Sequence, residues 1–304
     1  MSLSMSQQQP LISIVILNYN QLKVTCEFIE STKLLTYKNY EIIMVDNASK
    51  ENPTEHIKAN YPHVKLIVND KNLGFTGGNN VGIVAGKGDY FFIVNNDTEV
   101  TPNLLEKLLE PFDRDSSIGV VSPKIYYHSN PTIIQYAGFT EINPITGRNA
   151  VIGGKEEDRG QYNEGRYTAY AHGAAMLVKK EVIQKVGMLP EMFFIYYEEL
   201  DWSAHIRRAG YKIYYQPEAV IYHKESITMG KESAIKAYYH NRNRILFMKR
   251  NSSSFNFFLF SLFYTFLIVP KSVLKYIAKG QTTHLKNFFK GVLWNISKTK
   301  YSNL

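Results

Sequence analysis

Polar side chains follow four predicted strands of this 304-residue chain at the points where the strands end. In the clearest case, residues 90–94 are aromatic or aliphatic, and Asn95, Asn96, Asp97 and Thr98 follow without a spacer. Ligands of open α/β sheets bind beyond the carboxyl ends of the strands. Four such ends on adjacent parallel strands would form one crevice. The other three polar ends are Asn18 with Asn20, Asp46 with Asn47, and Asn69 with Asp70.

The oxygen atoms at these strand ends could hold a metal ion. Carboxylate and amide oxygens are hard donors, suited to Mg²⁺ or Mn²⁺ that carries phosphate groups. A carboxylate at Asp46 could also accept hydrogen bonds from a base or a ribose. The alternative at both places is structural, because Asn, Asp and Thr favour turns and helix N-caps.

Residues 72–82 are rich in glycine and lead into a predicted helix. Glycines let backbone amides approach a phosphate, and the start of a helix favours an anion. The segment lacks the G-x-G-x-x-G spacing of dinucleotide-binding folds and the G-K-[ST] of a P-loop. The sequence therefore supports neither NAD binding nor ATP hydrolysis.

Three acidic residues, Glu198, Glu199 and Asp201, begin a predicted helix directly after an aromatic stretch. Acidic side chains there complement the helix dipole, which is a sufficient structural explanation. A carboxyl group beside aromatic rings can also have a raised pKa and act as a general base. His223 follows another predicted strand; a lone histidine is usually structural, unless the fold brings it to Asp97.

Strands alternate with helices along residues 11–230, which predicts an α/β fold with a Rossmann-like, mostly parallel central sheet flanked by helices. The predicted strands are 11–17, 41–45, 64–68, 89–94, 118–125, 135–139, 174–178, 212–215 and 219–222. The predicted helices are 21–35, 54–60, 79–86, 102–112, 181–186, 198–209 and 232–250. We expect a disordered tail at 1–10, a nucleotide-binding half at 11–112, an acceptor half at 113–230 and a helical extension at 231–304. Residues 153–166 are charged and contain glycine, which predicts a mobile loop.

The net charge of +8 is unevenly distributed, because residues 231–304 hold 13 of the 35 basic residues and one of the 27 acidic residues. The same extension holds the longest apolar run, 255–269, which is short for a membrane span of about 20 residues. Flanking lysines and arginines favour a helix lying on an anionic membrane surface. The alternative is a helix packed on the body of the protein.

Nucleic-acid binding is a further alternative for the extension, since aromatic and basic residues could form a cationic stacking groove. The residues concerned are Tyr238, Tyr239, Arg242 and Arg244. Their position beside an apolar run argues for a membrane, and we predict no nucleic-acid partner. The single cysteine, Cys26, favours a reducing compartment, and residues 1–9 lack the apolar core of a signal peptide. We expect a cytoplasmic protein peripherally associated with the inner face of the cell membrane.

Taken in order, these motifs resemble glycosyltransferase family 2, which has the GT-A fold. The similar segments are 14–20, 45–49, 72–79, 88–98, 172–177, 193–201, 208–211 and 220–223. They cover about residues 11–230. Within the family, the chain looks most like bacterial rhamnosyltransferase-type members that build surface polysaccharides.

The resemblance implies an inverting, metal-dependent transfer of a sugar from a nucleotide-diphosphate donor, dTDP-rhamnose or a UDP-hexose, to a glycan or lipid-linked acceptor. Asp97 and His223 would ligate Mg²⁺ or Mn²⁺, and Glu199 would be the catalytic base, with Glu198 and Asp201 as alternatives. Asn95 stands where many members carry another Asp, so we expect weaker metal binding. The implied substrate-binding residues are Asn18, Asn20, Asp46, Asn72, Gly74, Asn79, Asn96, His172, Gly173, Glu198 and Asp201. A second hypothesis is a membrane-attached scaffold of the same fold that has lost turnover.

Overall fold

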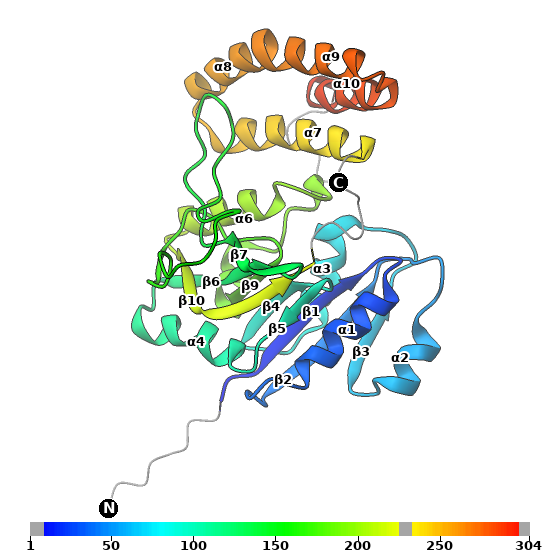
Figure 1. Ribbon diagram of the computed structural model, residues 1–304, viewed down its shortest axis with the longest axis vertical. Helices are drawn as coiled ribbons and strands as arrows, with labels where there is room; N and C mark the ends of the chain where they lie inside the picture. The colour runs from blue at the N-terminus through cyan, green and yellow to red at the C-terminus, as the bar shows by residue number, and fades with distance from the viewer. Residues whose placement is uncertain (1–8, 225–232, 298–304) are drawn as a thin grey trace, which may run out of the picture.

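The computed structural model describes residues 9–224 and 233–297 (Figure 1). Of the predicted tail, 1–10, only Gln9 and Pro10 are described, and their carbonyl groups accept hydrogen bonds from Asn39 and Tyr37. The first two residues of the predicted extension and the last two lysines of the chain lie outside the described ranges.

Four parallel strands form the first half of the sheet, in the order β3-β2-β1-β4. Strand residues are largely apolar, and two buried clusters cover the two faces of the sheet, as parallel strands under helices require. The register pairs Asn18 with Asp46 and Leu17 with Asn95, so the polar strand ends align along one side of the sheet. The elements are β1 (Ile12–Asn18), α1 (Leu22–Thr32), β2 (Tyr40–Asp46), α2 (Thr54–Asn60), β3 (Val64–Val68), α3 (Gly74–Ala85) and β4 (Tyr90–Asn95).

The second half of the sheet is mixed, and the complete order is β3-β2-β1-β4-β9-β6-β10-β5. Strand β9 joins the halves, because it pairs antiparallel with both β4 and β6. The predicted parallel character therefore belongs mainly to the first half. The remaining elements are β5 (Thr98–Val100), α4 (Leu104–Arg114), β6 (Ile118–Tyr127), β7 (Asn130–Tyr136), β8 (Arg166–Tyr167), β9 (Ala175–Lys179), α5 (Lys180–Val186), η1 (Glu191–Phe193), α6 (Glu198–Arg208) and β10 (Lys212–His223).

Helix α3 begins at Gly74, five residues before its predicted start. Most glycines of the segment therefore lie inside the helix and not in a loop before it. They let the helix pack closely on the sheet. A Cβ atom at Gly78 would lie 2.3 Å from the Leu17 side chain, and one at Gly82 would lie 2.4 Å from Val15. Strand β10 also differs from prediction, since it is one strand with an irregularity between Gln216 and Val220 instead of two.

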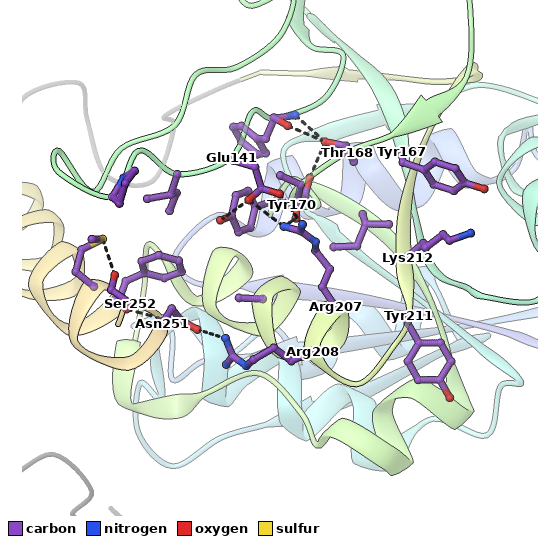
Figure 2. A pocket seen from close by; sticks show the side chains of 18 of the residues that line it. Glu141, Tyr167, Thr168, Tyr170, Arg207, Arg208, Tyr211, Lys212, Asn251 and Ser252 are labelled. Carbon is purple, nitrogen blue, oxygen red and sulfur yellow. Dashed lines mark hydrogen bonds and ion pairs between the residues drawn. The ribbon is translucent and has the colours of Figure 1, made fainter. Parts of the chain in front are cut away.

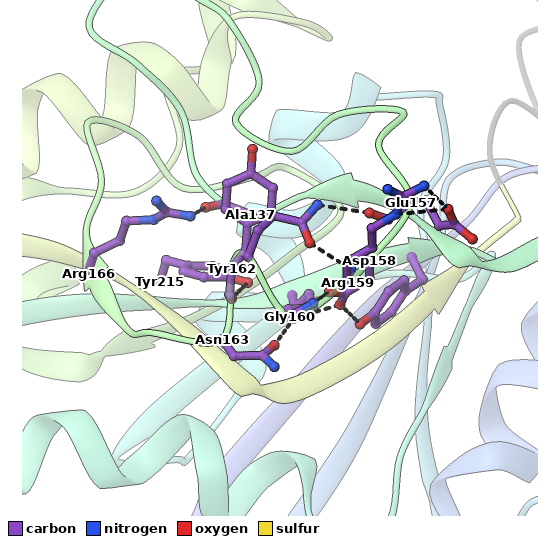
Figure 3. Close-up of polar contacts among 12 residues, drawn as sticks. Ala137, Glu157, Asp158, Arg159, Gly160, Tyr162, Asn163, Arg166 and Tyr215 are labelled. Atoms are coloured by element: carbon purple, nitrogen blue, oxygen red, sulfur yellow. Dashed lines mark hydrogen bonds and ion pairs between the residues drawn. The ribbon is translucent and has the colours of Figure 1, made fainter.

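The charged segment 153–166, predicted to be a mobile loop, has no regular structure before β8 but is fastened to the sheet (Figure 3). Lys124 Nζ donates hydrogen bonds to Asp158 at 2.8 Å and to Asn163 at 2.7 Å. The hydroxyl of Tyr215 donates to the carbonyl oxygen of Tyr162 at 3.0 Å. These contacts hold the loop at several points along its length.

Residues 233–297 form a layer of helices above α6 in Figure 1. Helix α7 (Ala234–Asn251) lies nearest to α6, and α8 (Ser254–Phe263), the π-helical turn η2 (Tyr264–Ile268) and α9 (Val269–Ala278) form the outer edge. Helix α10 (Thr282–Ser297) packs on α7. Pro270 has no backbone N–H, so it cannot donate the hydrogen bond that would continue a regular α-helix. The π-helical turn just before it accommodates the missing bond.

The outer helix is longer than the sequence pattern indicated. It continues from Ser254 to Ala278, and its 25 residues are long and apolar enough to cross a membrane, by length and composition only. Only 11% of the most apolar 18-residue window of this helix is buried, whereas a core helix of a soluble protein would be mostly buried. The extension therefore presents a large apolar surface.

Candidate functional site

A chain of hydrogen bonds crosses the carboxyl ends of β2, β1 and β4. Asn18 Nδ2 donates to Asp46 Oδ1 at 2.6 Å, and the hydroxyl of Thr25 donates to Asn18 Oδ1 at 2.8 Å. Asn96 Nδ2 in turn donates to the Thr25 hydroxyl at 2.8 Å, and Asp97 follows Asn96 in the chain. The fold therefore brings these predicted site residues together. Thr25 was missed, because a threonine in the first turn of a helix carries no signal of its own.

Asp46 is fully buried and also forms an Asx turn with Ser49. The backbone N–H of Ser49 donates to Oδ2 at 3.0 Å, and its hydroxyl donates to Oδ1 at 2.6 Å. Asn20 belongs to the same turn, since its Oδ1 accepts a hydrogen bond from the N–H of Lys50. An ionised carboxylate has about four acceptor positions, so these contacts leave room for one ligand donor.

Asp97 and His223 meet where β4 and β10 end. His223 Nε2 lies 3.0 Å from Asp97 Oδ1, and His223 Nδ1 lies 2.9 Å from Gln135 Oε1. Because an amide oxygen only accepts hydrogen bonds, Nδ1 carries the proton, and a neutral ring turns its Nε2 lone pair toward the carboxylate. The ring nitrogen and the carboxylate oxygen are close enough to share a cation. This cation is either a second proton on the ring or a metal ion bound by both atoms.

The contacts continue from this pair to Glu199. Tyr136 follows Gln135, and its ring centroid lies 5.0 Å from that of His172. Gly173 follows His172, and a Cβ atom at Gly173 would lie 3.7 Å from Glu199 Cγ. Asp97 and Glu199 are therefore linked through residues that are sequence neighbours or packing partners, and His172 is also near enough to His223 for the charge of His223 to lower its pKa.

His172 is held in one protonation state and one orientation. Its Nδ1 accepts a hydrogen bond from the N–H of Ala174 at 3.0 Å, so the neutral ring carries its proton on Nε2. Burial, and then the nearby His223, lower the pKa of His172 to about 3. The ring lies parallel to Phe139, with 5.6 Å between centroids. His172 is thus a neutral hydrogen-bond donor at neutral pH.

Glu198 and Glu199 open α6 with carboxyl oxygens that lack partners. Oε2 of each residue is buried and has no hydrogen bond within the described part of the chain. Burial raises the pKa of Glu199 to about 7. Burial and then the charge of Glu199 raise the pKa of Glu198 well above its ordinary value. At neutral pH, Glu199 can therefore both accept and release a proton, while the raised pKa of Glu198 favours its protonated form.

A strained turn precedes these two acids. Phe194, Tyr196 and Tyr197 have φ values of 65°, 70° and 71°, a left-handed conformation that favours glycine. Non-glycine residues keep such angles only where the surrounding structure enforces them, often at functional sites. The turn fixes the direction in which α6 leaves, and with it the position of Glu199.

Helix α7 supplies most of the contacts that hold this turn. Asn243 is fully buried, and its amide donates to the carbonyl oxygens of Phe193, Ile195 and Tyr196 at 2.9, 2.7 and 2.8 Å. Arg242 donates to the carbonyl oxygen of Phe193 at 2.6 Å. Sequence analysis missed both roles, because the groups they contact are backbone carbonyls about 50 residues away.

The arginines that suggested nucleic-acid binding are not on the surface. Arg242 is 6% exposed and Arg244 is 3% exposed. Arg242 lies against the ring of Trp294, and Arg244 donates to the carbonyl oxygen of Thr146 at 2.8 Å. They hold the extension to the body, so the observation that motivated a nucleic-acid groove does not hold.

The start of α3 is occupied by contacts within the protein. Asn72 Oδ1 accepts the N–H of Gly74 at 2.8 Å, and the carbonyl oxygen of Phe194 accepts the N–H of Phe75 at 2.7 Å. Asn79 donates back to its own helix, to the carbonyl of Phe75. These contacts give no support to a phosphate contact at Asn72, Gly74 or Asn79. They fasten α3 to the strained turn instead.

Asp201 is also occupied. Its carboxylate is fully buried, accepts two hydrogen bonds from Arg250 at 3.0 and 3.1 Å, and accepts one from Asn251 at 2.6 Å. Both partners are at the end of α7. The substrate-binding role predicted for Asp201 receives no support from these contacts, which join the extension to α6.

Arg250→Ala is expected to lower the free energy of unfolding by about 3 kcal/mol, because it leaves a buried carboxylate without its cation. Arg159→Ala is a matched control, since the side chain of Arg159 is 79% exposed and pairs with Glu157 on the surface. That change should cost at most about 0.5 kcal/mol. Urea unfolding followed by circular dichroism measures both; equal midpoints for the two variants would contradict the structural role of the pair.

Two pockets adjoin this region. The smaller, of about 390 Å³, is lined by Glu199 together with residues of the 139–149 loop and α7. The larger, of about 1050 Å³, lies at the other end of α6 and contains none of the predicted site residues (Figure 2). Its arginines are already engaged, Arg207 by Glu141 and Arg208 by Asn251. The smaller pocket is the one connected to the candidate chemistry.

Comparison with known proteins agrees with this geometry. The sequence profile described as glycosyl transferase family 2 matches residues 13–187. An uncharacterized protein of Sinorhizobium fredii, y4gI, is 28% identical over 262 residues, which are 82% of this chain and 28% of that protein. The N-acetylglucosaminyl-diphospho-decaprenol L-rhamnosyltransferase of Mycobacterium tuberculosis is 24% identical over 241 residues, 73% of this chain and 78% of its own length.

Among solved structures, GalNAc-T7 with UDP, GalNAc and Mn²⁺ superposes with a TM-score of 0.64 at 18% sequence identity. The match covers 80% of this chain and 48% of that chain. This chain thus spans less than half the length of GalNAc-T7 and of the Sinorhizobium relative. The likeness confirms the predicted fold class, GT-A.

Proposed function

This chain belongs to glycosyltransferase family 2, and from that premise we propose that it moves a deoxyhexose, rhamnose, from a nucleotide-diphosphate donor to a lipid-linked glycan with the help of a divalent cation. That the protein is a glycosyltransferase follows from its family; the cation, donor and acceptor are the proposal. The activity in the name of the mycobacterial relative supports the sugar and the acceptor. The UDP and Mn²⁺ in the solved structure support the donor class and the cation.

Asp97 and His223 are the residues that we propose to hold Mg²⁺ or Mn²⁺. Asp97 Oδ1 and His223 Nε2 lie 3.0 Å apart, close enough for both to bind one ion as neighbouring ligands. No group of three or more His, Cys, Asp or Glu side chains suited to a metal is present among residues 9–224 and 233–297, so donor oxygens and water would complete the shell. Such an ion neutralises the charge that grows on the departing diphosphate. The nucleoside of the donor would bind beside the same strand ends. The residues that would line this place are Asn18, Asn20, Asp46 and Asn96.

Glu199 is the proposed general base. Its carboxylate would take a proton from the acceptor hydroxyl while the hydroxyl oxygen bonds to the anomeric carbon, on the face opposite the departing diphosphate, so that the configuration inverts. A pKa of about 7 suits this task, because the base is then partly ionised and still strongly basic at neutral pH. Burial favours the protonated form of Glu198, and Asp201 is bound to Arg250, which supports Glu199 among the three acids. His172 would donate its Nε2–H to an oxygen of the acceptor.

The observations that carry the proposal are the hydrogen bonds that join Asp46, Asn18, Thr25 and Asn96, the pairing of Asp97 with His223, and the close approach of Gly173, next to His172, to Glu199. The test incubates the full chain with dTDP-rhamnose or UDP-hexoses, Mn²⁺ and a lipid-diphosphate-linked N-acetylglucosamine. We expect glycan extension that EDTA abolishes. A donor that raises the melting temperature without release of nucleoside diphosphate would favour the scaffold hypothesis instead.

The extension is proposed to attach the enzyme to the inner face of the cell membrane. Lysines on α9 and α10 lie near exposed apolar side chains and would contact anionic headgroups. A transferase that acts on a lipid-linked acceptor must reach that surface. The large exposed apolar side chains of the extension are Ile235, Phe255, Phe258, Leu262, Phe266, Leu267, Leu274, Ile277, Phe289, Leu293 and Ile296.

Replacing both Phe258 and Phe266 by Ser is expected to reduce membrane binding more than about tenfold, because each buried Phe contributes about 1.5–3 kcal/mol. The two side chains are 56% and 70% exposed, so the fold should tolerate the change. Flotation of the full chain with vesicles that contain anionic phospholipid measures the effect. Val84→Ser, at a 73% exposed position on α3, is the matched control.

Unchanged flotation of the double variant would show that this face does not contact the membrane. An alkaline carbonate wash of native membranes then separates two kinds of attachment. A helix lying at the interface is released by the wash, whereas a helix that crosses the bilayer stays. We expect release.

A further inference from the structure

The pocket of about 390 Å³ beside Glu199 has cations on two sides. Arg148 reaches it from the loop that follows the turn at residues 143–147, and Arg244 reaches it from α7. Glu199 is its only acidic lining residue. The two arginines come from segments almost 100 residues apart in the sequence, and their meeting here depends on the packing of the extension against the body.

Several donors in this pocket have no partner among the residues that the structure describes. The guanidinium of Arg148, an exposed residue, makes no hydrogen bond or ion pair with any residue of the described ranges. The Nδ2 of Asn149 is buried and likewise without a partner. Arg244 is 3% exposed and directs its Nε and Nη2 to the carbonyl of Thr146, so Nη1 is left without a bond inside the described protein.

The two positive charges act on one another. Burial and then the charge of Arg148 lower the pKa of Arg244. A guanidinium remains charged in any case, so the repulsion is a cost that a bound anion would remove. Guanidinium groups and amide N–H groups that converge on one pocket are the donor set that binds phosphate oxygens, often in a bidentate manner.

We propose that Arg148, Arg244 and Asn149 bind the diphosphate that joins the acceptor saccharide to its lipid. The assignment rests on the proposed function, since it takes Glu199 as the residue that contacts the acceptor hydroxyl. The proposed function assigns the donor's diphosphate to Asp97 and His223, and neither residue lines this pocket. We therefore assign an anion bound here to the acceptor.

The surroundings of the pocket suit the rest of such an acceptor. The rings of Tyr196 and Phe139 line the pocket and offer flat apolar faces for a sugar ring. Helix α7 forms one wall. Figure 1 shows α7 between α6 and the outer helix, whose exposed apolar side chains include Phe258 and Phe266. The diphosphate would thus lie between the catalytic base and the membrane-facing layer, where the lipid begins.

Binding of inorganic pyrophosphate to the full chain in the presence of EDTA tests the proposal, because chelation removes the cation on which the donor site depends. Arg148→Ala should weaken pyrophosphate binding about tenfold or more, since a charge-assisted contact is lost. Arg148→Lys should recover part of the affinity. Arg159→Ala, an exposed arginine of a neighbouring loop, should match the wild type. Isothermal titration calorimetry gives all four affinities, and UDP with Mn²⁺ should bind wild type and Arg148→Ala within about twofold.

The proposal fails if the wild type does not bind pyrophosphate or if Arg148→Ala binds it equally well. It also fails if Arg148→Ala loses as much affinity for UDP as for pyrophosphate, because that result would assign the pocket to the donor. With an active enzyme, Arg148→Ala should raise KM for a lipid-diphosphate acceptor and leave KM for an alkyl glycoside of the same sugar unchanged. The pyrophosphate measurement needs no turnover. Absence of sugar transfer with intact pyrophosphate binding would therefore refute the transferase function and not the anion pocket.

Discussion

Glu199→Gln is expected to lower kcat by about 10²–10⁴-fold, the contribution typical of a positioned general base. The amide of Gln has the shape of the carboxylate but cannot take a proton from the acceptor hydroxyl. Donor affinity should stay within about twofold, because the proposed nucleoside and diphosphate contacts lie at the ends of β1, β2, β4 and β10. Steady-state transfer assays and calorimetry with UDP and Mn²⁺ measure the two quantities separately.

The pH profile makes the assignment specific. A base works in its deprotonated form, and burial raises the pKa of Glu199 to about 7. The wild-type kcat/KM should therefore rise as the pH increases through about 7 and level off above it. Glu199→Gln should lose this rise. Glu198→Gln is the comparison: burial raises the pKa of Glu198 well above its ordinary value, and its replacement should preserve the profile; the opposite pattern would make Glu198 the base.

Asp97→Asn and His223→Ala are each expected to reduce Mn²⁺-dependent turnover by about 10²-fold or more, because each removes one of the two proposed protein ligands. Higher Mn²⁺ concentration should restore part of the activity, since the defect is in metal affinity. Asp70→Asn is the matched control: Asp70 is also an acid at the end of a strand, but it is exposed. Titration of activity with Mn²⁺ gives the apparent affinity of each variant.

An Asp97→Asn enzyme with the Mn²⁺ dependence of the wild type would place the cation elsewhere. Gln135 offers a further check, because it holds the His223 ring through Nδ1. Replacement of a residue that orients a metal ligand typically costs 10–100-fold in metal affinity, so Gln135→Leu should have a smaller effect than His223→Ala.

The first half of the fold could be predicted closely because its strands are continuous apolar runs that end in polar residues. Residues 54–60 and 64–68 match α2 and β3 to the residue. The rule that ligands gather beyond parallel strand ends also placed Asp46, Asn18, Asn96 and Asp97 together correctly. These features depend on local composition and on one general property of α/β sheets, both of which are visible in a single sequence.

The second half could not be predicted to the same degree, because its structure depends on contacts between distant segments. Nothing near β9 in the sequence indicates that it pairs antiparallel with β4. The glycines of α3 resemble a phosphate loop until the packing on Leu17 and Val15 is known. Asp201 looks like a third catalytic acid until Arg250 is seen beside it. Each error has the same cause, a residue type that serves chemistry and packing equally well.

Asn243 holds the turn that aims the catalytic base, and it lies about 50 residues after that turn in the chain. Ribosomes add about 5–20 residues per second, so Glu199 is made some seconds before the helix that sets its position. A nascent chain that already carries the proposed sugar-nucleotide contacts still lacks the helix that holds the turn before Glu199. We expect that the enzyme becomes competent only when α7 has been synthesised, which would keep unfinished chains from consuming activated sugars.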